Sequence, residues 1–230
     1  MNLAQMLDTA RLAAQHVMRP APPVPTPFTT PIPATPAHVL DGKREMRDPV
    51  AFFASLRKFT GPLDQVQVDV INRILVGANH WSTSWLAYGL ATPWHECRFR
   101  PIPEIGKGRG RFYGKPGKWY GQIPYGRGLP QTTHDYNYEW ADAALGLNGT
   151  LLRDFDRMLE PDISARTLIL GMETGAFTGK SLKKYLSGEY ATYEQFIPCR
   201  RIINVTDRAE MIAGYAVKIQ DCIRAGKWED

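Results

Sequence analysis

The sequence predicts a mainly α-helical domain that is interrupted by one irregular segment and preceded by a proline-rich stretch. Helical periodicity with recognisable caps begins at residue 48 and returns after residue 160. Between residues 106 and 128 the periodicity is lost, and glycine, aromatic and basic residues take its place. We therefore expect three parts: an amphipathic helix at residues 1–19, a linker at 20–47 and a domain at 48–226.

The expected N-terminal helix has one apolar stripe, because apolar residues recur every three or four positions. A helix of this length is only marginally stable alone. It could dock on another chain or a membrane surface, pack on its own domain, or be frayed. Prolines at every second or third position of 20–36 favour polyproline II, a stiff spacer with a reach on the order of 50 Å. Such a spacer would let the helix anchor the domain at a distance.

Composition sets broader limits. The 43% of hydrophobic residues suffices for a packed core, and the net charge of +5 suits an anionic partner such as a bacterial wall, a nucleic acid or a membrane surface.

No apolar run reaches the roughly 18 residues of a membrane span, and the N-terminus lacks a secretory signal, so we expect synthesis in the cytoplasm. Cys97, Cys199 and Cys222 have no metal-like spacing and are expected as reduced thiols, although a bridge between the last two remains open.

Three helices are expected at the start of the domain. Asp48 before Pro49 is a helix start, and Asp64 with Gln67 forms a capping-box pair for the second helix. The third begins near Ser84. The expected core faces contain Phe52, Phe53, Leu56 and Phe59 in the first helix, Val68, Ile71, Ile74 and Leu75 in the second, and Leu86, Leu90 and Trp94 in the third.

Two glutamates follow in a pattern that suits general acid/base chemistry. The third helix must end before Pro101 and Pro103, which places Glu96 in its last turn. The helix dipole and nearby aromatic residues would favour the protonated form of Glu96 there. Glu104 lies beyond the prolines among glycines and basic residues, where it should stay solvated and ionised. One acid and one base is what hydrolysis of a glycosidic bond requires.

The irregular segment admits other interpretations. Cations interleaved with aromatic rings suit single-stranded nucleic acid, whereas in a sugar-binding cleft the rings stack on pyranose faces. A metal site is disfavoured, because His95 and Glu96 are adjacent on a helix and point to different faces. Cys97 lacks the His and Asn pattern of a nucleophile. We expect no cofactor.

The strings HE, PIPE, YGRG and QTTHDYNY, in this order, resemble the family 19 chitinases and, more closely, the lysozyme-like endolysins of bacteriophages. The resemblance extends from about residue 48 to about residue 225 and includes GMETGAFTGKSLKKYL and RRIINVTDRAEMIAGYA. Departures include Thr132 and His134, where Leu and Trp are usual, Cys97 after the glutamate, and Val205 in place of Gly.

The resemblance implies a mainly α, lysozyme-like α+β fold: two helical lobes around a cleft, with a small irregular or β-hairpin segment near 106–128. It implies Glu96 as the general acid and Glu104 as the second carboxylate, with Thr133 helping to hold water. The implied substrate-binding residues are Gln131, Asn137, Tyr125, Arg127, His134, Arg201 and Asn204. For His134 a capping or surface role is also open, and for the last two a salt bridge and a helix cap.

Helices return in the last third of the chain. Pro161 opens one with Ile163, Leu168, Ile169 and Met172 inward, a short one follows Thr178, and Asp207 with Glu210 should cap a long final helix that ends at Gly226. Its core face should contain Met211, Ile212, Tyr215, Ile219 and Cys222. Glu173, in an expected turn, is a competing catalytic carboxylate.

We expect a peptidoglycan hydrolase that cuts the β-1,4 bonds between amino sugars, with bacterial peptidoglycan as its partner and with no nucleic acid. It would be made in the host cytoplasm and act on the wall after release or within a phage particle, where the N-terminal helix would bind a structural protein. An inverting mechanism would place the two carboxyls roughly 6.5–9.5 Å apart. A chitinase, a catalytically inactive wall-binding module and a nucleic-acid binder remain alternatives.

Overall fold

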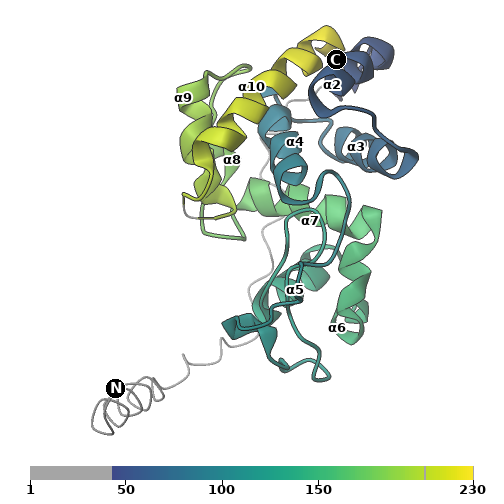
Figure 1. Ribbon diagram of the computed structural model, residues 1–230, viewed down its shortest axis with the longest axis vertical. Helices are drawn as coiled ribbons and strands as arrows, with labels where there is room; N and C mark the ends of the chain where they lie inside the picture. The colour runs from purple at the N-terminus through teal and green to yellow at the C-terminus, as the bar shows by residue number, and fades with distance from the viewer. Residues whose placement is uncertain (1–42, 205, 230) are drawn as a thin grey trace, which may run out of the picture. The chain divides into compact units, whose positions relative to one another are not determined.

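The computed structural model of this protein describes residues 43–204 and 206–229, so the predicted N-terminal helix and most of the predicted linker lie outside the described residues. The described part is mainly helical, as predicted (Figure 1). Its longer helices are α2 (Pro49–Thr60), α3 (Gln65–Gly77), α4 (Thr83–Cys97), α5 (Asp135–Ala144), α7 (Pro161–Thr174) and α10 (Ala209–Ala225). Its shorter ones are α6 (Thr150–Arg153), α8 (Leu182–Tyr185), α9 (Tyr193–Phe196), and the 3-10 helices η1 (Phe112–Gly114), η2 (Phe155–Leu159) and η3 (Ile197–Ile202).

Local signals in the sequence set the starts of the first helices. The Asp48 side chain accepts a hydrogen bond of 2.8 Å from the Ala51 amide, and Asp64 and Gln67 form the complete capping box that was predicted. Both starts are therefore confirmed. Of the predicted core positions in α2, α3 and α4, all are buried except Phe59, Val68 and Trp94, which are partly buried against the same core.

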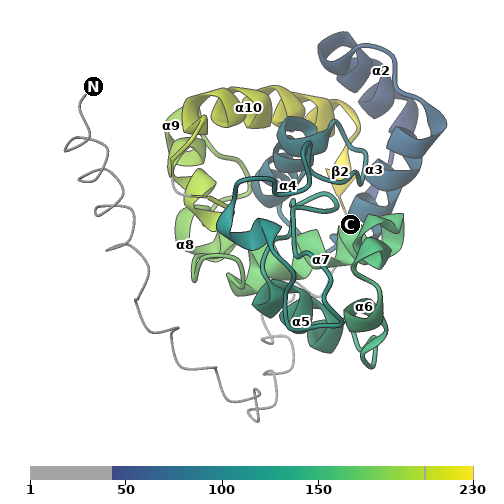
Figure 2. The same cartoon turned by 60° about the horizontal axis from the view of Figure 1, so that its bottom comes forward.

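Two hydrophobic cores divide the described chain into two helical lobes. The larger core is built by α2, α3, α4, α8, α9, η3 and α10, and the smaller one by α5, α6 and η2. Helix α7 belongs to both, because Ile163 packs in the smaller core whereas Leu168 and Met172 pack in the larger one. Figures 1 and 2 show α7 between the two groups of helices.

The segment 106–128 is irregular. It consists of turns and η1, and it is tied to its surroundings by isolated bridges that pair Arg127 with Pro103 and with Thr132. Within the described residues, the named strands lie elsewhere: β1 (Glu45–Met46) pairs antiparallel with β2 (Trp228–Glu229). The small sheet therefore joins the two ends of the described chain.

Three local predictions were wrong. Helix α10 begins at Ala209 after Arg208 in a left-handed conformation, with no side-chain cap, so Asp207 does not cap it. Met211 is 46% exposed, because it lies on the outer face of α10. Glu173 lies in the last turn of α7 instead of a turn between helices.

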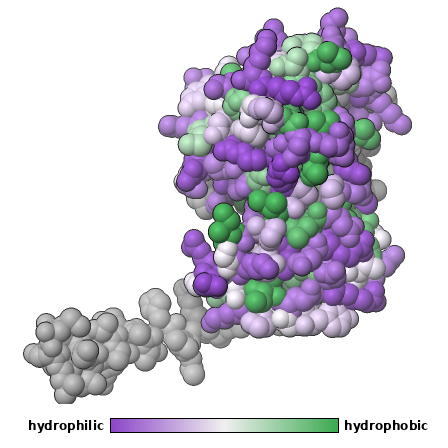
Figure 3. All heavy atoms as spheres, turned by 45° about the vertical axis from the view of Figure 1, so that its right-hand side comes forward, coloured by the Kyte–Doolittle hydropathy of each residue, from purple (hydrophilic) through white to green (hydrophobic). Residues whose placement is uncertain are grey.

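Cys97, Cys199 and Cys222 are free thiols in the larger core. Among residues 43–204 and 206–229, none of the helices combines the length and apolar character needed to cross a membrane. The face in Figure 3 is mostly hydrophilic, with hydrophobic residues in small patches, since most large apolar side chains are enclosed in the two cores.

Candidate functional site

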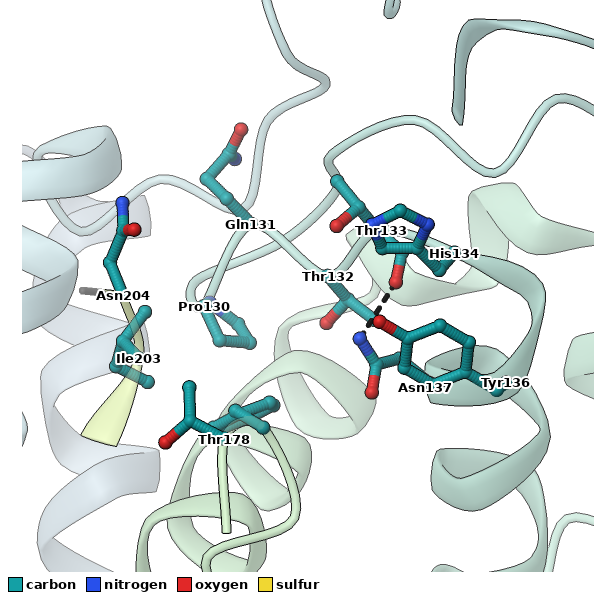
Figure 4. Close-up of a pocket in the computed structure, with 11 residues that line it drawn as sticks. Pro130, Gln131, Thr132, Thr133, His134, Tyr136, Asn137, Thr178, Ile203 and Asn204 are labelled. Atoms are coloured by element: carbon teal, nitrogen blue, oxygen red, sulfur yellow. Dashed lines mark hydrogen bonds between the residues drawn. The ribbon is translucent and has the colours of Figure 1, made fainter. Parts of the chain in front are cut away.

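A pocket of about 390 Å³ lies where the two lobes meet. One wall is the loop before α5 and the first turn of that helix, and the opposite wall is formed by the turn after α7 and by the segment after η3 (Figure 4). The wall residues are mostly polar or aromatic. They are Pro130, Gln131, Thr132, Thr133, His134, Tyr136, Asn137, Phe177, Thr178, Ile203 and Asn204.

Five predicted site residues line this pocket together. They are Gln131, Thr133, His134, Asn137 and Asn204. Asn137 donates a hydrogen bond of 2.8 Å to the backbone oxygen of Thr133, and Gln131 donates to the backbone oxygens of Ile102 and Gly128. These bonds fix both amide groups, so each keeps its side-chain oxygen in a defined position.

Glu104 is held beside Gln131. The Tyr113 hydroxyl donates to Oε1 of Glu104 and the Gly126 amide donates to Oε2, each at 3.0 Å. A Cβ atom at Gly126 would lie only 3.2 Å from Glu104 Oε2 and 3.0 Å from Gln131 Oε1. A side chain at position 126 would therefore push the carboxylate and the amide aside by a few tenths of an ångström, whereas glycine lets both approach the same stretch of backbone.

Tyr113 keeps its proton available for this bond. Burial raises the pKa of the Tyr113 hydroxyl, and the hydrogen bond to Glu104 raises this pKa further. The ring of Tyr113 also contacts His134 edge-to-face at 5.3 Å between centroids. Glu104 is thus connected to the pocket wall through Tyr113 and through Gln131.

Glu96 lies in the last turn of α4, as predicted, but it has a partner that was not predicted. The Arg200 guanidinium lies 2.6 Å from Oε1 of Glu96 and is itself only 3% exposed. Arg200 also donates to the backbone oxygen of Asp207 at 2.9 Å. The residues near Glu96 in the sequence favour its neutral form, whereas Arg200, which lies 104 positions away, brings a positive charge to it.

Arg200 connects Glu96 to the second wall of the pocket. The amides of Ile203 and Asn204, both pocket residues, donate to the backbone oxygen of Arg200 at 3.2 and 2.9 Å. Neither candidate carboxylate is among the residues that line the pocket. Each is linked to a different wall through neighbours, Glu104 through Gln131, which lies with it against Gly126, and Glu96 through Arg200.

Three predicted binding residues have other roles in the structure. Arg127 is 4% exposed, and its guanidinium binds Asp156, backbone oxygens of its own loop and the Tyr138 hydroxyl. Tyr125 is 6% exposed and packs under that guanidinium, 3.5 Å from ring centroid to Cζ. Arg201 is exposed and does not line the pocket. Arg127 and Tyr125 stabilise the loop that leads to the pocket. The salt bridge that was the alternative role for Arg201 is formed by its neighbour Arg200, with Glu96.

Glu173, the competing carboxylate, contacts Trp81 and His80 outside the pocket. Its Oε1 atom accepts a hydrogen bond from the buried indole of Trp81 and pairs with His80. Both partners lie in the turn before α4, so the contact joins that turn to the end of α7. Glu173 therefore acts as a structural link, outside the pocket.

Backbone strain occurs beside both candidate carboxylates. Gln131 and His134 have positive φ angles of 52° and 69°, and Arg98 and Phe99, just after Glu96, have 54° and 57°. Non-glycine residues in this region cost free energy, and such residues concentrate at functional sites.

Several pocket residues were missed by sequence reasoning. Tyr136 lies in the motif that was singled out, and its ring stacks on His134 at 5.1 Å between centroids. Phe177, Thr178 and Ile203 come from turns between helices, for which periodicity gives no signal. Arg200 directly precedes Arg201, which was predicted to bind substrate. The missed residues had one signal in the sequence: they lie in the strings that carry the family resemblance, as Tyr136 and Arg200 do.

Protonation of two histidines should destabilise the fold. Burial lowers the pKa of His95 and of His134 below the ordinary value of 6.5, and Nδ1 of His95 is buried without a hydrogen-bond partner. Below pH 6.5 the unfolded chain therefore binds more protons than the folded one, so the free energy of unfolding falls as pH decreases. Urea unfolding between pH 7 and 5 measures this slope. It should become flatter in the double variant His95→Gln/His134→Gln; an unchanged slope would contradict the assignment.

No protein-family model matches the sequence, and no curated protein matches it. Among the described residues, no group of three or more His, Cys, Asp or Glu side chains is placed to hold a metal ion. A function for this chain therefore has to be argued from its own residues and their geometry.

Proposed function

We propose that the protein is a peptidoglycan hydrolase that cleaves β-1,4 bonds between amino sugars by general acid/base catalysis. The observation that carries this proposal is that two carboxylates are linked to different walls of one polar, aromatic pocket, Glu104 through Gln131 and Glu96 through Arg200. Two carboxyl groups flanking a bound sugar are the minimum for acid/base glycoside hydrolysis.

The two carboxyl groups have different surroundings, which supports different roles. Glu104 accepts hydrogen bonds at both oxygens from neutral donors, as suits a base that holds a water molecule together with Gln131 and Thr133. The motif resemblance assigns Glu96 the role of general acid, in which it would donate a proton to the leaving oxygen. Its ion pair with Arg200 does not itself favour that role, so a proton would have to replace this contact first. The amides of Asn137 and Asn204 and the ring of His134 would contact the sugar.

The motif resemblance to phage endolysins supports a bacterial wall as the substrate. In that setting the protein would act on the wall after release from the host cytoplasm or as part of a phage particle. Residues 1–19 would then bind a structural protein of the particle, and the expected inverting mechanism would place a water molecule between Glu104 and the sugar.

Digestion of purified Gram-negative peptidoglycan tests the proposal. We expect Glu104→Gln to lower the rate of release of reducing ends by about 10²- to 10⁴-fold, because the amide cannot accept a proton from water. Mass spectrometry of the products identifies the sugar at each new end: muramic acid indicates a muramidase and glucosamine a glucosaminidase.

The matched control is Glu210→Gln, which makes the same change at an exposed position of α10. It should digest the wall at the rate of the wild type. Cleavage of chitin oligomers without cleavage of peptidoglycan would reassign the substrate, and undiminished activity of Glu104→Gln would remove Glu104 from the mechanism.

A further inference from the structure

The loop 108–114, whose Tyr113 binds the candidate catalytic carboxylate Glu104, presents two arginines. Arg109 and Arg111 are exposed, and none of the carboxylates in the described part of the chain pairs with either guanidinium. The surrounding sequence has one sign of charge, since residues 105–134 contain six Lys or Arg residues and no Asp or Glu. No carboxylate within residues 105–134 therefore neutralises these positive charges.

The loop is held by its backbone. Gly108 and Gly114 are in direct contact at its neck, where a Cβ atom on Gly114 would lie 1.8 Å from the Gly108 oxygen. Hydrogen bonds of 2.9 and 3.0 Å join Arg111 to Gly108 and Gly114 to Arg111. The Tyr113 hydroxyl, within the same loop, binds Glu104. These contacts fix the backbone of both arginines relative to Glu104.

A row of rings connects this loop to the pocket. Tyr136 stacks on His134, both of which line the pocket, and His134 contacts Tyr113. Phe112, the next residue in the loop, is 87% exposed. Flat apolar surfaces of this kind contact sugar rings, so a polymer in the pocket would extend along the row toward the arginines.

We propose that Arg109 and Arg111 bind the carboxylates of the peptide branches on a glycan strand whose sugars occupy the pocket. This rests on the proposed function. Guanidinium groups bind carboxylates through paired, charge-assisted hydrogen bonds, and a neutral amino-sugar polymer offers no such partner. The loop would therefore select a peptide-bearing, anionic strand over an unbranched neutral one.

A lipid surface is the other partner with suitable chemistry, because Ile105 and Phe112 are 97% and 87% exposed beside the cations. The direct hydrogen bond between the loop and Glu104, and the row of rings that reaches the pocket, favour the ligand that occupies the pocket.

Sedimentation with insoluble sacculi tests the proposal. All proteins carry Glu96→Gln, so that the sacculi remain intact, and binding is measured to native sacculi and to sacculi whose carboxylates have been converted to neutral methylamides. Arg109→Gln/Arg111→Gln should bind native sacculi about three- to tenfold more weakly, as expected for two exposed ion pairs, and should bind amidated sacculi as its parent does. The control Arg57→Gln/Lys58→Gln removes two exposed charges from α2 and should bind both as the parent does.

Unchanged binding to native sacculi, or an equal loss toward native and amidated sacculi, would overturn the proposal. A loss toward vesicles of phosphatidylglycerol with none toward sacculi would assign the loop to a lipid surface instead. The hydrolase assignment is tested separately. It fails if the protein without Glu96→Gln releases no reducing ends. The difference in binding between native and amidated sacculi would still show whether the loop binds carboxylates.

Discussion

Replacing Glu96 with glutamine is expected to lower the rate of peptidoglycan digestion by about 10²- to 10⁴-fold, because the amide cannot donate a proton to the leaving oxygen. Release of reducing ends from purified peptidoglycan measures the loss. The fold should remain, since the amide oxygen can still accept a hydrogen bond from Arg200. The cost of leaving that buried guanidinium without a counter-charge should be about 1–3 kcal/mol, measured by urea unfolding.

Glu96→Asp separates the two effects. It keeps the negative charge for Arg200 but withdraws the carboxyl by one methylene, so we expect most of the stability and little of the activity to be retained. If Glu96→Gln digested peptidoglycan at the rate of the wild type, the general acid would lie elsewhere. Glu173 would be a poor replacement, because Trp81 and His80 already bind it outside the pocket.

Arg127→Met is expected to lower the free energy of unfolding by about 2–4 kcal/mol. Methionine fills a similar volume but donates no hydrogen bond, so the carbonyl of Ile123 and the hydroxyl of Tyr138 lose a donor, and Asp156 loses its ion pair. Denaturant unfolding monitored by circular dichroism measures the change.

The exposed Arg109 provides the matched control. Arg109→Met should change the free energy of unfolding by no more than about 0.5 kcal/mol, since the side chain has no partner to lose within the described part of the chain. A stable Arg127→Met variant with weakened binding to sacculi would contradict the structural role and restore the role in substrate binding that the motif implies.

What the sequence predicted correctly depends on short-range interactions. The caps at Asp48 and at Asp64 with Gln67 form between residues three positions apart, and burial in α2 and α3 follows helical periodicity. The failed cap at Asp207 shows the limit, since Arg208 adopts a left-handed conformation and leaves the next turn without a side-chain acceptor. Local patterns report what neighbouring residues can do, and tertiary contacts decide whether they do it.

The candidate site shows the same limit over longer distances. The polar residues of the loop before α5 were predicted together, and the structure brings Asn204 to the same pocket. The partners of the carboxylates were not predicted. Glu96 meets Arg200 and Glu173 meets His80 across 104 and 93 positions, and no periodicity encodes such pairs. Arg127 lies in a motif that suggests binding, yet its burial could be known only from the packing of the smaller core.

Helix α7 links the formation of the pocket to the folding of both lobes. Ile163 packs in one core, and Leu168 and Met172 pack in the other, so neither core is complete without this single helix. Loss of one lobe would expose apolar surface of α7 that the other lobe does not cover, which couples the folding of the two lobes into one cooperative event. Since the walls of the pocket come from both lobes, the pocket would form in that same event, and it would be lost as a whole when either lobe unfolds.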